Sequence, residues 1–72
     1  MKHYPRIREL RTEKGFTTVK VSTALGIEQS YYSKLEFGKH QVSIENLIKI
    51  ANYYNVSLDY LTERTNKREI NQ

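Results

Sequence analysis

Residues 17–38 read TTVKVSTALGIEQSYYSKLEFG, and this stretch decides the fold of the chain. Val21 and Leu25 stand four residues apart, a spacing that places both side chains on one face of a helix. Gly26 follows at once, and glycine readily adopts the left-handed conformation that closes many helices. The stretch therefore predicts two short helices joined by a tight turn at Gly26, with the Thr17 hydroxyl capping the first helix.

The second of the two helices is expected over residues 29–37, with one apolar and one polar face. Tyr32 and Leu35 are three residues apart and form the stripe that this helix buries. The other face carries amide, hydroxyl and ammonium groups without a carboxylate, which suits a groove of DNA. Its members are Gln29, Ser30, Ser33 and Lys34.

Helical patterns continue on both sides of this stretch. Pro5 suits the first turn of a helix over residues 6–14, which Gly15 would end. Further along, Ser43 is the predicted cap of a helix over residues 44–54, where apolar residues recur at the spacing of one helix face. No segment alternates apolar and polar residues as a half-buried strand does, so the pattern favours an all-α fold.

A fifth helix is expected to begin after Ser57 and to reach residue 64. The sequence thus predicts a compact five-helix bundle over residues 1–64. Residues 65–72 form a polar C-terminal tail that either frays or extends the last helix. The expected core residues are Ile7, Leu10, Phe16, Val21, Leu25, Ile27, Tyr32, Leu35, Leu47, Ile50, Ala51, Val56, Leu58 and Leu61.

Composition narrows the possible functions. The chain has no cysteine, which excludes disulfides and thiolate metal sites, and no apolar run is long enough to span a membrane. The net charge is +4, and all of the surplus lies in residues 1–41, which hold eight Lys and Arg against four Glu. This asymmetry fits a polyanionic partner, although many small soluble domains are equally basic. We expect a cytoplasmic, nucleoid-associated protein.

The side chains present do not suggest a catalytic or metal site. His3 and His40 are far apart in sequence, and neither has a carboxylate or thiolate nearby at the spacing of metal ligands. The sequence offers no combination of a nucleophile, a base and a group that orients the base, as a catalytic site requires. A bundle this small also has little room for a substrate pocket. The chain is therefore expected not to be an enzyme and to bind neither a metal nor a cofactor.

Three runs of the sequence resemble the lambda repressor and Cro type of helix-turn-helix domain, often called the XRE family. They are RIRELRTEKGF, ALGIEQSYYSKLEFGK and SIENLIKIANYYNVSLDYL, and together they cover most of residues 6–62. Their markers are Ile-Arg-x-Leu-Arg before a glycine, Ser-x-x-Glu-x-Gly-Lys, and the closing Val-Ser-Leu-Asp-x-Leu. The resemblance implies a transcriptional regulator, a repressor, that binds double-stranded DNA sequence-specifically as a homodimer on a two-fold site.

By position, the resemblance also implies roles for individual side chains. The helix over residues 29–37 would lie in the major groove, and the helix before it would cross the DNA backbone. The base readers would be Gln29, Ser30 and Lys34, with Ser33 nearby. Phosphate contacts would come from Thr17, Thr18 and Lys39, and Arg11 would pair with Glu36.

The residues themselves leave alternatives to these roles. Gln29 is either a base reader or an ordinary exposed amide, and Lys34 reaches either guanine or phosphate. Tyr31 is expected at the rim of its helix, with its hydroxyl on a phosphate or its ring packed on the preceding helix. We expect the pair of Arg11 and Glu36 to be structural and to orient Arg11 toward phosphate; the alternative is two solvated charges of little energetic value.

The sequence departs from the family pattern at several positions. Thr18 stands where the family commonly has glutamine, and Phe37 replaces the asparagine before the closing glycine. Val21 and Ser22 replace the usual leucine and alanine. These changes bear on single phosphate contacts and leave the predicted fold unchanged.

The electrically neutral half of the chain contains apolar and amphipathic groups that a small bundle need not bury. They are Tyr53, Tyr60 and Ile70, and they favour a two-fold interface formed by the last helix and the tail. The alternative is that the tyrosines cover their own core. The rival function is a protein-interaction module, such as an antitoxin or anti-repressor, which salt-sensitive DNA binding would distinguish from a regulator.

Overall fold

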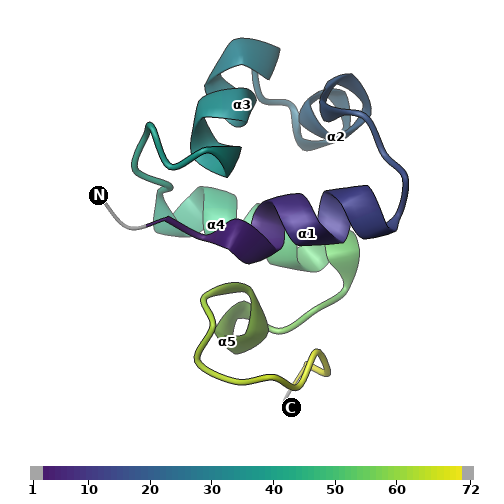
Figure 1. Ribbon diagram of the computed structural model, residues 1–72, viewed down its shortest axis with the longest axis vertical. Helices are drawn as coiled ribbons and strands as arrows, with labels where there is room; N and C mark the ends of the chain where they lie inside the picture. Colours follow the sequence, from purple (N-terminus) through teal and green to yellow (C-terminus); the bar gives the residue numbers. More distant parts are fainter. Residues whose placement is uncertain (1–2, 71–72) are drawn as a thin grey trace.

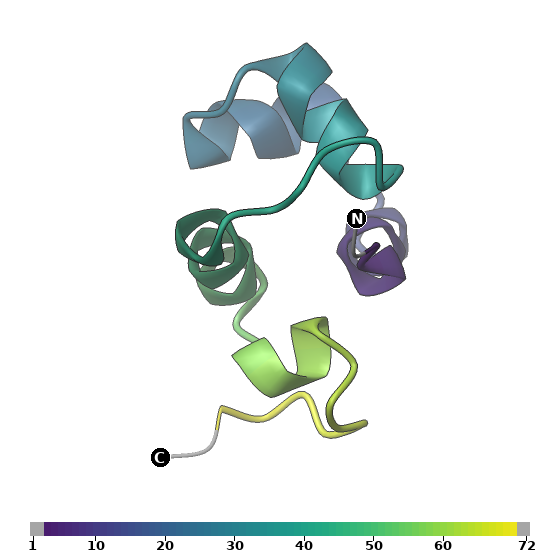
Figure 2. The same cartoon turned by 90° about the vertical axis from the view of Figure 1, so that its left-hand side faces the viewer.

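The computed structural model describes residues 3–70, and over that range the chain forms five helices and no strand. In Figures 1 and 2 one end of the molecule consists of α2 and α3, the middle of α1 and α4, and the opposite end of α5 and the segment after it. The all-α prediction is therefore confirmed. The helices are α1 (Pro5–Glu13), α2 (Thr18–Leu25), α3 (Gln29–Glu36), α4 (Ile44–Tyr54) and α5 (Leu58–Leu61).

Hydroxyl side chains fix where three of these helices begin. The Thr17 hydroxyl accepts from the N–H of Lys20 at 3.0 Å, which caps α2. Ser43 and Ser57 cap α4 and α5 in the same way, through the amides three residues further on. At the other end of α2, Gly26 takes the left-handed conformation with a φ of 69°, so the predicted turn is confirmed.

The last helix is shorter than predicted. It ends at Leu61, whereas the sequence suggested a helix to residue 64. Glu63 takes a left-handed φ of 66°, and a right-handed helix cannot continue through that conformation. The N–H of Arg64 instead bonds the carbonyl of Asp59 at 2.8 Å, which closes the helix with a turn.

The segment after α5 folds back under the bundle, so it neither frays nor extends the helix. The guanidinium of Arg6 in α1 donates to the carbonyl of Thr65 at 2.6 Å. Arg68 forms an ion pair with Glu13 at the end of α1, also at 2.6 Å. These side-chain contacts tie the segment to α1, and Figure 1 shows the segment beside α5 at the end of the molecule. Residues 71–72 of the predicted tail lie outside the described residues.

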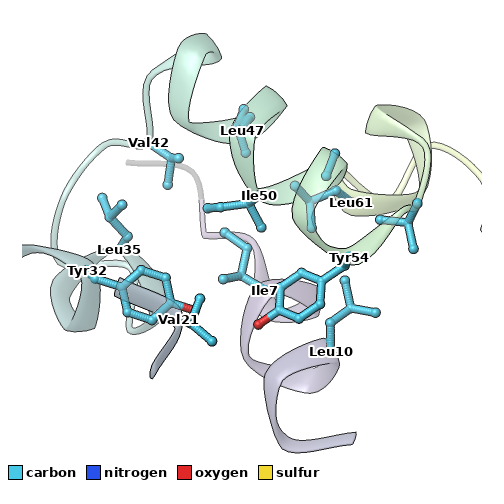
Figure 3. Close-up of a cluster of buried hydrophobic side chains, with 12 residues drawn as sticks. Ile7, Leu10, Val21, Tyr32, Leu35, Val42, Leu47, Ile50, Tyr54 and Leu61 are labelled. Carbon is cyan, nitrogen blue, oxygen red and sulfur yellow. The ribbon is translucent and has the colours of Figure 1, made fainter. Parts of the chain in front are cut away.

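Most of the predicted core is confirmed, and Figure 3 shows its side chains meeting between α1, α3 and α4. A helical pattern tells which face turns inward but not how deeply, and positions at helix ends lie at the rim of so small a core. The prediction was wrong for Phe16, Leu25, Ile27 and Leu58, which are only half-buried, and it missed the buried Val42 and Tyr54.

Two tyrosines expected at a subunit interface instead cover the protein's own core. Tyr53 packs against the ring of Phe16, with ring centroids 6.1 Å apart. Tyr60 lies beneath the guanidinium of Arg6, whose central carbon is 4.2 Å from the ring centroid. Of the three groups named from the sequence, Ile70 is the one that stays exposed.

Candidate nucleic-acid interface

Helix α3 lies at one end of the molecule beside α2 (Figure 1), and its polar face is open to solvent. Tyr32, Leu35 and Glu36 turn inward and are buried. The outward residues line one shallow groove, which also includes Lys39 from the loop after the helix. The groove is lined by Glu28, Gln29, Ser30, Ser33, Lys34, Phe37 and Lys39, so the structure brings the four expected base readers together.

A hydrogen bond joins α2 to the start of α3 inside this interface. The side-chain amide nitrogen of Gln29 donates to the Thr18 hydroxyl at 3.1 Å. This contact orients the amide and uses one of its two N–H groups. The second N–H and the amide oxygen remain as the donor and acceptor that an adenine edge requires.

Sequence reasoning missed an acid at the start of α3. The Glu28 carboxylate accepts from the N–H of Ser30 at 3.1 Å and from its hydroxyl at 2.6 Å. These hydrogen bonds, which favour the charged form, lower the pKa of Glu28. The groove therefore contains a negative charge, contrary to the prediction of a face without carboxylates. Glutamate is not among the residues preferred as helix caps, so residue type alone did not signal this role.

Ser30 has a narrower role than the sequence suggested. Its hydroxyl proton is donated to Glu28, so only its oxygen lone pairs remain to accept from a ligand. Ser33 is half-buried, whereas Lys34 and Lys39 are exposed beside it. The two ammonium groups are therefore the charged donors that this groove presents.

Behind the groove, Arg11 of α1 and Glu36 of α3 form an ion pair with two hydrogen bonds. Nε of Arg11 lies 2.6 Å from Oε2 of Glu36, and a second nitrogen lies 3.1 Å from Oε1. The third nitrogen donates to the carbonyl of Phe16 at 2.8 Å. The side chains are 14% and 0% exposed, so the alternative of two solvated charges does not apply.

The pair also changes the expectation for Arg11 as a phosphate contact. All three guanidinium nitrogens donate inside the protein, and the hydrogen bond to Glu36 is the main cause that raises the pKa of Arg11. Its geometry favours a structural role that ties α1 to α3 over a direct contact with DNA.

Two phenol groups lie buried in the core near this pair. Figure 3 shows the hydroxyls of Tyr32 and Tyr54 pointing toward each other across the space between α3 and α4. Within the part of the chain that the structure describes, neither hydroxyl has a hydrogen-bond partner of good geometry. Burial disfavours the phenolate, so it raises the pKa of both groups, that of Tyr54 to about 12.

Alkali is therefore expected to destabilise the domain between pH 10 and about 12. Below pH 10 both phenols are neutral in the folded and the unfolded chain, so they do not lower the free energy of unfolding. Above it the unfolded chain ionises first, which lowers the free energy of unfolding until the folded groups titrate as well. Urea unfolding at increasing pH measures this loss, and Tyr54→Phe should make it smaller. An identical pH profile for the variant would contradict the assignment.

The remaining predicted contacts lie around the rim of the groove. Tyr31 is half-buried, and its ring packs edge-on against His40 with centroids 5.3 Å apart. Thr17 accepts from the backbone as a cap, which leaves its hydroxyl proton available to an external acceptor.

Among residues 3–70 no three acidic or histidine side chains gather as a metal site would need. No helix in that range is long and apolar enough to cross a membrane.

Comparison with known proteins identifies the family of this chain. A family model described as helix-turn-helix matches residues 7–61. An uncharacterized HTH-type transcriptional regulator from the SPbeta prophage of Bacillus subtilis, YonR, is 35% identical over 60 residues, which is 83% of this chain and 56% of that protein. The regulator DdrOP3 of Deinococcus deserti is 36% identical over 63 residues, covering 88% of this chain and 49% of the relative.

A third relative, the regulator ImmR of Bacillus subtilis, is 34% identical over 56 residues, or 78% of this chain and 44% of its own length. The chain thus spans about half the length of the curated relatives that it matches. No solved structure matches it significantly.

Proposed function

Because this chain belongs to the helix-turn-helix family of the lambda repressor and Cro type, we propose that it is a transcriptional repressor that binds double-stranded DNA. In this proposal α3 enters the major groove while α2 crosses the backbone, and the protein works at the nucleoid. The supporting observation is the groove on α3, where an oriented amide and two ammonium groups are exposed together. Its relatives are named as transcriptional regulators, which points the same way.

Base reading is assigned to the groove residues on α3. Gln29 suits adenine, since its free N–H and oxygen match the N6 and N7 groups of that base. Lys34 suits guanine or a nearby phosphate, and Ser33 is small enough to permit close approach. Ser30 acts only as an acceptor because its proton is held by Glu28.

Phosphate contacts are assigned to the rim. Thr17 and Thr18 stand where α2 begins, the helix end whose free N–H groups favour anions. Lys39 follows α3 and is exposed, and the half-buried Tyr31 ring carries a hydroxyl group. These groups position the protein on DNA of any sequence.

We propose that the functional form is a homodimer on a two-fold site, with the two α3 helices in successive major grooves about 34–36 Å apart. The exposed side chains Ile44 and Ile48 of α4, together with Ile70, support this assignment. Ile48 and Ile70 line one apolar hollow between α4 and the C-terminal segment. The homodimer would be contradicted if sedimentation showed only one chain bound to a palindromic duplex.

Replacing Lys39 by alanine is expected to weaken binding to all duplexes alike, because a phosphate contact carries no sequence information. The slope of log affinity against log salt should become flatter by about one unit, since one fewer counterion is released. Lys67→Ala is the matched control, because its segment lies at the end of the molecule away from α3 (Figure 1). An unchanged slope for Lys39→Ala would show that this lysine does not contact phosphate.

A further inference from the structure

One aromatic side chain stands exposed on the polar face of α3. Phe37 caps the end of the helix and is 53% exposed. Phe37 follows Ser33 by four residues and Gln29 by eight, the spacing of one helix face, and its φ of −92° and ψ of 5° mark the point where the helix ends. All three line the same groove. The ring therefore extends the reading face of the helix by one turn.

The ring is held in place from behind by α1. The guanidinium carbon of Arg8 lies 5.2 Å from the centroid of the Phe37 ring, within the range of a cation–π contact. Two ion pairs occur among residues 3–70, and Arg8 belongs to neither of them. Its charge therefore remains available to an anion beside the ring.

His3, which lies just before α1, contacts the same end of α3. The ring of His3 donates through Nε2 to the carbonyl of Glu36 at 2.9 Å, directly before Phe37. On the other side of Phe37, Gly38 has a φ of 73°, and a Cβ placed there would lie 3.0 Å from the His3 ring. The backbone on both sides of Phe37 is thus constrained, which limits where its side chain can lie.

The chemistry of the major groove indicates what such a ring would touch. Apart from its cation–π contact with Arg8, an exposed ring gains free energy where it meets another apolar surface. The edges of the bases in the major groove present mainly hydrogen-bonding groups, and the C5 methyl group of thymine is their largest apolar group. Phenylalanine is one of the side chains that recognise this methyl group by apolar contact.

We propose that Phe37 is a specificity-determining residue that contacts the C5 methyl group of one thymine in each half-site, while Arg8 binds the adjoining phosphate. This inference rests on the proposed DNA binding, and it adds a base-contacting side chain that is neither an amide nor a cation. A ring that serves only to shield the adjacent turn would show no preference for thymine.

Deoxyuridine tests the contact directly, because it differs from thymidine only by lacking the methyl group. Each thymine of the preferred duplex is replaced in turn, and the dissociation constant is measured. The wild-type chain should lose about three- to five-fold in affinity at one thymine per half-site, the size expected for one buried methyl group. Phe37→Ala should bind the two duplexes equally, and Phe37→Leu should keep part of the preference.

Val19→Ala provides the matched control, since Val19 is also an exposed apolar side chain, at 54%, but lies on α2 outside the groove. It should preserve the full preference for thymine. The inference is overturned if the wild-type chain tolerates deoxyuridine at every position, or if Phe37→Ala discriminates as strongly as the wild-type chain. Absence of salt-sensitive duplex binding by the wild-type chain is a different result, because it removes the proposed function itself.

Discussion

Replacing Glu36 by glutamine is expected to lower the free energy of unfolding by about 3 kcal/mol, the lower end of the range for breaking a buried pair. Glutamine keeps the volume of the side chain but removes its charge, so Arg11 would remain in a site that is only 14% exposed without a counter-charge. The amide oxygen still accepts one hydrogen bond, which keeps the loss from being larger. Urea unfolding followed by circular dichroism measures the change.

The exposed ion pair between Glu13 and Arg68 supplies the control for this experiment. Its side chains are 46% and 47% exposed, and the pair has the same short distance of 2.6 Å. Solvent screens such a pair, so Glu13→Gln should lower the free energy of unfolding much less than Glu36→Gln does. If both variants lowered the free energy of unfolding equally, burial would not determine how much the pair of Arg11 and Glu36 contributes to stability.

Replacing Gln29 by alanine is expected to remove about 1–3 kcal/mol of discrimination at one base pair of each half-site. The amide is held by the Thr18 hydroxyl at 3.1 Å, so it presents its remaining donor and acceptor with little freedom to adapt. The affinity for the preferred duplex should fall while the affinity for unrelated duplexes changes little. Competition binding with duplexes that carry each base at every position measures this loss.

Asn52 of α4 supplies the control, because it is an exposed amide outside the α3 groove. It lines the hollow that we connect with the homodimer, so its loss could change the total affinity but not the ranking of bases. Asn52→Ala should leave the base preference intact. A Gln29→Ala variant with the same ranking of bases as the wild-type chain would remove Gln29 from the set of readers.

The arrangement of helices was predictable because several local signals agree. The apolar spacing of α4, the hydroxyl caps and the glycine turn each favour the same element boundaries, and the structure follows them. The end of α5 was not predictable in this way, because nothing in a glutamate signals the left-handed conformation of Glu63. Depth of burial at Phe16 and Leu25 also depends on how helices cross, which periodicity does not contain.

The candidate site was predictable in its members but not in its internal hydrogen bonds. Spacing alone placed Gln29, Ser33 and Lys34 on one face, and they line one groove. That Ser30 gives its proton to Glu28 follows from backbone geometry at the start of α3, which no spacing rule supplies. The commitment of Arg11 to three internal acceptors likewise appears only when α1 and α3 are brought together.

Selection of bound duplexes from a random pool tests the proposed function most directly, because it needs no assumption about the sequence that is recognised. If α3 reads bases in a two-fold complex, the pool should yield a palindromic motif with half-site centres about 10–10.5 base pairs apart, and binding should weaken steeply with salt. A pool without any enriched motif, or binding that does not respond to salt, would contradict DNA reading by this helix and favour a protein-interaction module.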